Sequence, residues 1–190
     1  SVVSNNEYSI INPYRVEIDT FPATDFEKVK EQLIAYVEKI AGELQLVDGI
    51  FHMQYRMRDG KPIIIEAMRR TLGNMYGVPA RMVQDFAWEY WEARTHVGLP
   101  CEEIPHVRTT EGYSAYRTIM AKKNGKIKGI MIDSTIMPYI QSIFYLRNVE
   151  EVIENYLSEP IGFLFMKFES EDEMKRIVLE GYNLVSVRME

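Results

Sequence analysis

Glu66 is the side chain of this sequence best placed to do chemistry, because it follows the apolar residues 62–65 at the point where a buried strand would end. Carboxylate oxygens are the ligands that a hard cation such as Mg2+ prefers, usually together with the phosphates of a substrate. Arg69 and Arg70 follow within four residues. Glu66 is therefore either a cation ligand or one member of a structural ion pair with one of these arginines, and ion pairs are the commoner case.

Two short apolar segments around the turn dipeptide Asp59-Gly60 must position this carboxylate. They predict a β-hairpin with strands at residues 50–57 and 62–68. Paired strands hold the side chains of one face at fixed spacing, so a donor from each strand can reach the same ion. His52, in the first strand, is interpreted as a packed or pocket-wall histidine and not as a ligand or base.

The stretch from Gly49 to Gly73 resembles the signature of the ATP-grasp superfamily and reads GIFHMQYRMRDGKPIIIEAMRRTLG. That signature has a glycine, an apolar strand ending in a metal-binding Glu, a D-G-type hairpin, and an apolar strand running into E-x-N-x-R and another glycine. The resemblance implies an α+β fold, the C-terminal subdomain of an ATP-grasp domain: an antiparallel sheet with helices on one face, followed by a small β-rich lobe. The later elements are similar to those of carbamoyl-phosphate-synthase-like members.

Position by position, the resemblance implies that Glu66 is the second metal-binding carboxylate and that Arg70 contacts the phosphorylated substrate. Gln54 stands where the first carboxylate is expected, so it is the other predicted metal ligand. Met68 stands where the signature has Asn, and a thioether is a poor ligand for Mg2+. Ile65 is assigned with Glu66 to the nucleotide site, as a floor under the adenine, although packing alone would account for it.

The implied function is part of an ATP-dependent ligase that joins a small carboxylate to an amine or ammonia through an acyl phosphate. The phosphate-covering loop, the ATP-binding lysines and the substrate lobe of such enzymes are expected before residue 1, so the chain is interpreted as a truncated form or a fragment. ATP and Mg2+ are expected to bind only with the protein's own N-terminal half, and the chain alone is expected to be inactive. Two alternatives stay open: a degenerate, non-catalytic scaffold of the same fold, and an unrelated α+β domain that dimerises through methionine- and aromatic-rich surfaces.

The best internal boundary lies at residues 98–105, which a glycine and two prolines punctuate. Residues 1–105 are therefore predicted to complete the ATP-grasp domain, and residues 106–190 to form the β-rich lobe. Periodicity, caps and turn signals predict the remaining elements. These are extended segments in the first twenty residues, helices at 24–46 (capping box Thr24/Glu27), 79–95 (from Pro79), 148–157 (capped by Asn148) and 171–180 (capping box Ser170/Glu173), a hairpin of 113–122 and 126–132 around Asn124-Gly125, a strand pair at 136–146, and strands at 161–168 and 183–188.

Composition excludes several classes of protein. A formal net charge of −6 over 190 residues argues against a nucleic-acid or anionic-membrane surface. No apolar stretch approaches the roughly 20 residues of a membrane span. The single cysteine, Cys101, excludes an internal disulfide and a cysteine-rich metal site. The cytoplasm is the default compartment, and the exposed surface of an isolated half favours homo-oligomers.

Overall fold

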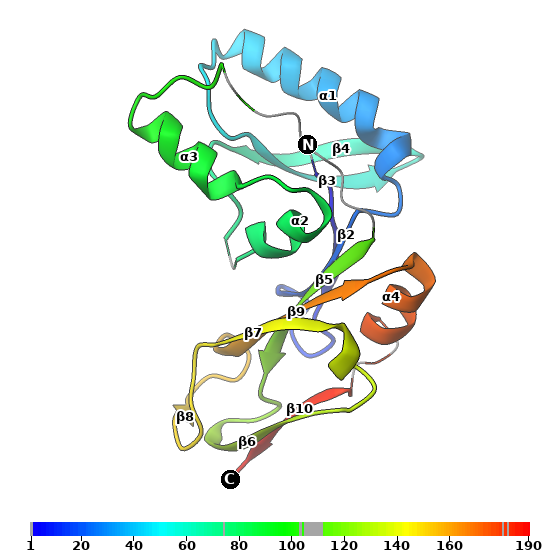
Figure 1. Cartoon of the computed structure of the whole chain (residues 1–190), viewed down its shortest axis with the longest axis vertical. Coiled ribbons are helices and arrows are strands. Elements are labelled where there is room, and N and C mark those ends of the chain that lie inside the picture. The colour runs from blue at the N-terminus through cyan, green and yellow to red at the C-terminus, as the bar shows by residue number, and fades with distance from the viewer. Residues whose placement is uncertain (1, 74, 103, 105–111, 180, 182) are drawn as a thin grey trace.

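A computed structural model describes residues 2–73, 75–102, 104, 112–179, 181 and 183–190. Helices and strands are mixed along these residues, which confirms the α+β class (Figure 1). The helices are α1 (Phe26–Glu43), α2 (Gly77–Val83), α3 (Trp88–His96) and α4 (Glu171–Val178), with a 3-10 turn, η1, at Met137–Tyr139. The strands are β1 (Asn5–Tyr8), β2 (Val16–Phe21), β3 (His52–Arg58), β4 (Lys61–Met68), β5 (Tyr113–Met120), β6 (Gly125–Ile132), β7 (Ile140–Tyr145), β8 (Val152–Ile153), β9 (Pro160–Phe168) and β10 (Val185–Met189).

The strands pair antiparallel in sheets of five, three and two strands. The largest has the order β1-β2-β5-β9-β7, the second has the order β10-β6-β8, and β3 and β4 form the predicted hairpin by themselves. The five-stranded sheet combines strands from both ends of the sequence, because β2 pairs with β5, for example through Ile18 and Arg117. β5 and β9 then pair along the full length of β5. The hairpin is thus a separate two-stranded unit.

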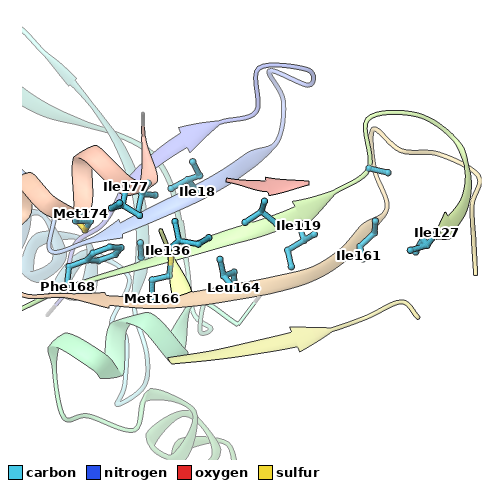
Figure 2. Close-up of a cluster of buried hydrophobic side chains, with 14 of the residues drawn as sticks. Ile18, Ile119, Ile127, Ile136, Ile161, Leu164, Met166, Phe168, Met174 and Ile177 are labelled. Carbon is cyan, nitrogen blue, oxygen red and sulfur yellow. The ribbon is translucent and has the colours of Figure 1, made fainter. Parts of the chain in front are cut away.

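The core of the molecule lies on the five-stranded sheet. On one face of this sheet, Met174 and Ile177 of α4 pack with Leu164 of β9 (Figure 2). The residues that alternate with these along each strand point to the other face of the sheet. There Phe165 of β9 and Tyr116 of β5 form a second cluster. The sheet is therefore buried on both sides, which explains why β9 is apolar almost throughout.

α1 confirms the first predicted helix but not its predicted start. Asp25 occupies the N-cap and makes no side-chain capping bond. The Thr24 hydroxyl instead donates to Glu171 Oε1 at 3.1 Å, at the start of α4. The capping box at Thr24/Glu27 is wrong because Thr24 bonds a distant element.

The single helix predicted at 79–95 is wrong, because the chain forms two helices here. α2 begins at Gly77, two residues before Pro79, and ends at Val83, and the next residue is extended. The break lets Phe86 pack its ring against Trp88 and Trp91, with centroid distances of 4.5 and 6.1 Å. Aromatic packing offsets the lost helical hydrogen bonds.

The hairpin predicted around Asn124-Gly125 is also wrong. β5 and β6 flank this dipeptide, but β5 pairs with β2 and β9, whereas β6 pairs with β10 and β8. The turn directs the chain from one sheet into another. The strand pair predicted at 136–146 is wrong as well, since η1 and the single strand β7 occupy this segment.

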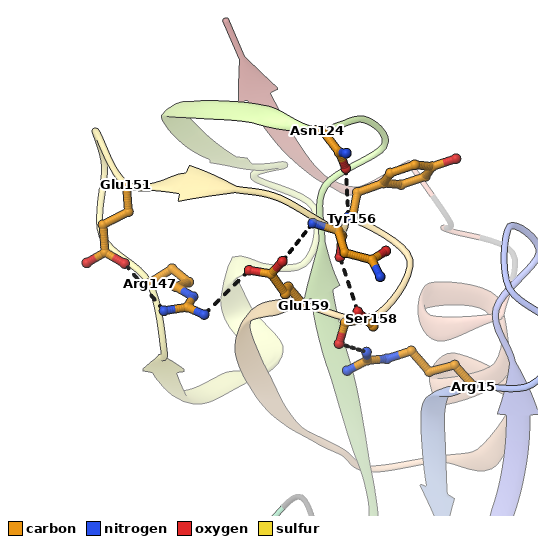
Figure 3. Close-up of polar contacts among 8 residues, drawn as sticks. Arg15, Asn124, Arg147, Glu151, Tyr156, Ser158 and Glu159 are labelled. Atoms are coloured by element: carbon orange, nitrogen blue, oxygen red, sulfur yellow. Dashed lines mark hydrogen bonds and ion pairs between the residues drawn. The ribbon is translucent and has the colours of Figure 1, made fainter.

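Residues 148–157 do not form the predicted helix; they contain β8 and turns, held by the polar contacts of Figure 3. The Tyr156 amide donates to Asn124 Oδ1 at 2.9 Å, and the Asn155 amide donates to Glu159 Oε1 at 2.6 Å. Asn148 bonds the Glu151 side chain instead of capping a helix. Side-chain acceptors thus replace the helical carbonyls as partners of these amides.

The last elements agree with the sequence. β9, α4 and β10 lie where a strand, a helix and a strand are predicted, and the Ser170 hydroxyl accepts a bond from the Glu173 amide at 3.2 Å. The domain boundary predicted between residues 105 and 106 lies outside the described residues. Among the described residues, none of the helices combines the length and the hydrophobicity of a membrane span.

Candidate functional site

The register of the hairpin brings the two predicted metal ligands together. Gln54 lies directly opposite Glu66, and His52 lies directly opposite Met68. Directly opposite residues point to the same face, with Cβ atoms about 4.5–5.5 Å apart. Since alternate residues of a strand share a face, all four side chains lie on one face of the hairpin.

The turn at the end of the hairpin fixes this register. Asp59 and Gly60 both have positive φ, 51° and 74°. Two positive φ angles are the geometry of a type I′ turn, whose twist matches that of the paired strands. The turn dipeptide therefore sets which residue of β3 meets which residue of β4.

Ile65 interrupts the regular pairing. Tyr55 pairs with Ile64 and Gln54 pairs with Glu66, so Ile65 is left without a partner as a β-bulge. Its side chain is 59% exposed. The residue predicted to lie under the adenine is thus an exposed bulge residue immediately before Glu66.

The side chains of these two residue pairs lie on the face of the hairpin that α1 does not cover. α1 packs against β4. Burial raises the pKa of Tyr55, and the negative charge of Asp25 beside α1 raises it further, which places Tyr55 on the α1 side. Gln54, the next residue in β3, points the opposite way. Gln54 and Glu66 are accordingly exposed.

His52 lies near two charged groups, Arg70 and Glu66. Burial lowers the pKa of His52, the positive charge of Arg70 lowers it further, and the carboxylate of Glu66 opposes both. Its Nδ1 atom is buried and has no hydrogen-bond partner within the described residues. Its surroundings thus favour the neutral form of the imidazole. Its position beside Glu66 is a feature that sequence reasoning missed, because the position depends on the register.

Arg70 lies just beyond β4, in a loop tied to α3. Its Nη1 donates to the carbonyl oxygen of Thr71 at 2.9 Å. The Thr71 amide donates to Glu92 Oε1 at 2.9 Å and its hydroxyl to Glu92 Oε2 at 2.5 Å. Burial raises the pKa of Glu92, but these bonds and the charges of His96 and Arg70 hold it below its ordinary value. Glu92 anchors the loop, and no sequence pattern identified it.

Arg69 points away from Glu66. Its Nη2 donates to the carbonyl oxygens of Val47 and Asp48, at 2.6 and 3.0 Å. Gly49 allows this approach, because a Cβ atom there would lie 2.4 Å from the same nitrogen. Among the described residues Glu66 forms no ion pair, so its carboxylate can accept a ligand.

The donors of this face fit a divalent cation that is shared with a nucleotide. Glu66 offers a carboxylate and Gln54 an amide oxygen, and Mg2+ is commonly bound by one or two carboxylates plus substrate phosphates. The described residues contain no group of three His, Cys, Asp or Glu side chains that could hold a metal by themselves. A cation at this face therefore needs ligands from elsewhere.

A two-stranded hairpin, backed by a long helix and followed by a mixed sheet, defines the class of fold. It is the fold of the C-terminal half of an ATP-grasp ligase. No protein-family model and no curated protein sequence matches the chain.

Individual solved structures carry this likeness. The chain is similar to L-amino acid ligase from Bacillus licheniformis, with a TM-score of 0.81 and 16% identity over 98% of the chain. It is similar to phosphoribosylglycinamide synthetase from Anaerococcus prevotii, with a TM-score of 0.78 and 16% identity over the whole chain. A third is the biotin carboxylase domain of 2-oxoglutarate carboxylase from Hydrogenobacter thermophilus, solved with MgADP and bicarbonate, with a TM-score of 0.68 and 16% identity over 94% of the chain.

The chain spans about half the length of these proteins. The matched part is 49% of the first two chains and 40% of the third. At these identities the likeness establishes the fold.

Proposed function

We propose that this chain is the metal-holding half of an ATP-dependent ligase that joins a carboxylate to an amine or ammonia through an acyl phosphate. The observation that carries the proposal is the direct pairing of Gln54 with Glu66 on the open face of the hairpin. The fold shared with an L-amino acid ligase and a phosphoribosylglycinamide synthetase supports the ligase class.

Each of the predicted site residues has a role in this proposal. Glu66 and Gln54 bind a divalent cation, and Ile65 contacts the nucleotide beside them. When bound, ATP and Mg2+ supply the phosphoryl group and neutralise part of its charge. Arg70 stabilises the negative charge on the phosphoryl oxygens. The loop anchored on α3 keeps the backbone next to Arg70 in place.

The rest of the site would come from the protein's own N-terminal half. The matched region makes up about half of the two ligases, which supports a missing half of similar size. That half would cover the open side of the hairpin, where Ile63 and Ile65 are 49% and 59% exposed. It would also bring the small carboxylate and amine substrates to the phosphoryl group.

The second candidate is a degenerate scaffold that keeps the fold without the chemistry. The observation that favours it is the pairing of a neutral amide, Gln54, with the single carboxylate Glu66, next to the thioether of Met68. A single negative charge holds a divalent cation more weakly than two. The substitution Gln54→Glu separates the candidates: it would create tight metal–nucleotide binding only in a scaffold that had lost it.

Calorimetric titration of Mg-ATP into this chain preceded by its native upstream sequence tests the proposal. Binding that Glu66→Ala abolishes is the expected result. The matched control is Asp59→Asn, which removes another carboxylate of the same hairpin and keeps the type I′ turn. Equal loss in both variants would indicate a general charge effect, and the absence of any binding to the unaltered protein would overturn the proposal.

A further inference from the structure

The open face of the hairpin, which α1 does not cover, continues from the predicted metal ligands towards the turn. Alternate residues of a strand share a face, so Arg56 and Arg58 follow Gln54 on this face. Lys61 of β4 lies directly opposite Arg58, and directly opposite residues also share a face. Arg56, Arg58 and Lys61 thus form a basic row beside the pair of Gln54 and Glu66.

The basic row is available to a ligand. All three of its residues are exposed. Arg56 and Lys61 form no hydrogen bond or ion pair with another described residue. Arg58 Nε lies 3.9 Å from Asp59 Oδ2, but these side chains are 82% and 93% exposed. Because exposed pairs of this kind contribute little, the fold does not depend on any charge of the row.

The charge of the row is opposite to that of the whole chain. The chain has a formal net charge of −6. On the open face, the three cations of the basic row outnumber the single carboxylate of Glu66, and Gln54 opposite it is neutral. A local excess of positive charge on an acidic protein attracts anionic ligands. The open face is therefore suited to an anion as well as to a cation.

Arg56 is the member of the row nearest to the predicted metal ligands. A strand advances about 3.3 Å per residue, so the backbone at Arg56 lies roughly 7 Å from that at Gln54. The side chain of arginine is long, and its planar guanidinium can donate to two phosphate oxygens at once. Arg56 can therefore reach a phosphate chain whose cation is bound at Glu66.

We propose that the basic row binds the phosphate chain of the nucleotide directly, with Arg56 as its main contact, beside the cation held at Glu66. This inference rests on the proposed function, which places the nucleotide on this face. The complex of ATP with one Mg2+ is still an anion, so the guanidinium attracts it. The direct contact offsets the weaker hold on the cation that results from the neutral amide of Gln54.

Calorimetric titration of Mg-ATP into the chain with its native upstream sequence is the first test. Arg56→Gln should weaken binding about 10-fold, because charge-assisted hydrogen bonds to phosphate are lost. Arg58→Gln lies further from the cation and should weaken binding only about 2- to 3-fold. Arg81→Gln, which removes an exposed arginine of α2, is the matched control and should leave the affinity unchanged.

Two fragments of the nucleotide identify the group that Arg56 contacts. Inorganic tripolyphosphate has the phosphate chain without the base, and adenosine has the base without the phosphates. With Mg2+ present, tripolyphosphate should compete with ATP for the unaltered protein and compete less well for Arg56→Gln. Adenosine should bind both proteins equally. If adenosine binding depends on Arg56 and tripolyphosphate binding does not, Arg56 contacts the base and the inference is overturned.

The outcomes also separate this inference from the proposed function. If Mg-ATP does not bind to the unaltered protein, the proposed function and this inference both fail. If Mg-ATP binds and Glu66→Ala abolishes binding, but Arg56→Gln has the same affinity as the unaltered protein, the ligase proposal stands and the role of the basic row is overturned.

Discussion

Carboxylate side chains are buried and bonded to neighbours in the five-stranded sheet, whereas the carboxylate of the hairpin site is exposed. In the sheet, Asp19 is 1% exposed and accepts a bond of 2.7 Å from Asn6. Glu17 and Arg117 form a buried ion pair with an N–O distance of 3.7 Å. In the hairpin, the carboxylate of Glu66 is exposed and forms no ion pair with a described residue.

This difference distinguishes the polar groups that stabilise the fold from those that are available for binding. Polar groups of the sheet are desolvated, so their interactions with each other support the fold. An isolated two-stranded hairpin is only marginally stable and here depends on α1 for cover. Its open face contributes little to folding and can therefore be used for ligands.

The largest expected effect on stability is in the sheet. Leu164 is fully buried in the core below α4. Leu164→Ala should lower the free energy of unfolding by about 2–5 kcal/mol, because it removes apolar contacts and leaves a cavity. Urea denaturation measures the change, and a loss below about 1 kcal/mol would contradict the assignment of this cluster as the core.

The buried carboxyl of Asp19 should make the sheet pH-sensitive. Burial raises its pKa from 3.8 to about 7, against hydrogen bonds from Ser4, Asn6 and Tyr76 that lower it. Between about pH 4 and pH 7 the folded state retains a proton that the unfolded chain releases, so this group makes stability fall as pH rises. The contribution is on the order of 2–4 kcal/mol.

The substitution Asp19→Asn mimics the protonated carboxyl. The free energy of unfolding of this variant, measured from pH 4 to pH 8, should fall less with pH than that of the unaltered protein. Parallel curves for the two proteins would show that Asp19 titrates normally.

A smaller effect is expected where the loop of Arg70 meets α3. Thr71→Val removes the hydroxyl bond to Glu92 and keeps the amide bond, so it should cost about 1–3 kcal/mol. A double-mutant cycle with Glu92→Gln isolates the coupling between the two side chains. Additive effects would show that this contact does not anchor the loop.

The smallest effect on stability is expected at the bulge. Ile65 is 59% exposed, and Ile65→Ala should change the free energy of unfolding by less than about 0.5 kcal/mol. The same variant should weaken nucleotide binding if Ile65 contacts the adenine. A large loss of stability would remove the contrast between the hairpin and the sheet.

The two turn dipeptides show what the sequence could predict. Asp59-Gly60 joins strands that pair with each other, whereas Asn124-Gly125 joins strands of different sheets. Gly125 has φ 140°, and a Cβ atom there would lie 2.4 Å from the Glu190 carbonyl oxygen. The glycine therefore serves a close backbone contact at the end of β10, and distant strands decide the pairing.

The candidate site, like the turns, was predictable only in part. The resemblance of residues 49–73 to the ATP-grasp signature named Gln54, Glu66 and Arg70 as candidate residues, because that signature lies within one short stretch of sequence. Placing His52 beside Glu66 requires the register of the hairpin. Identifying Glu92 requires its contact with Thr71, which lies 21 positions earlier in the chain. Neither fact is encoded in a short window of residues.

The bulge at Ile65 has a consequence for how related sequences should be compared. Because one extra residue lies between Ile64 and Glu66, the alternation of sides along β4 shifts by one position at this point. Ile64 and Glu66 have the spacing of same-side residues, yet they pair with neighbouring residues of β3 that point to opposite sides. A homologue that lacks this residue would keep its carboxylate opposite position 54 while its spacing from the turn became one shorter. Alignment of such sequences by turn-to-carboxylate distance would misplace the acidic residue, and alignment by strand partner would not.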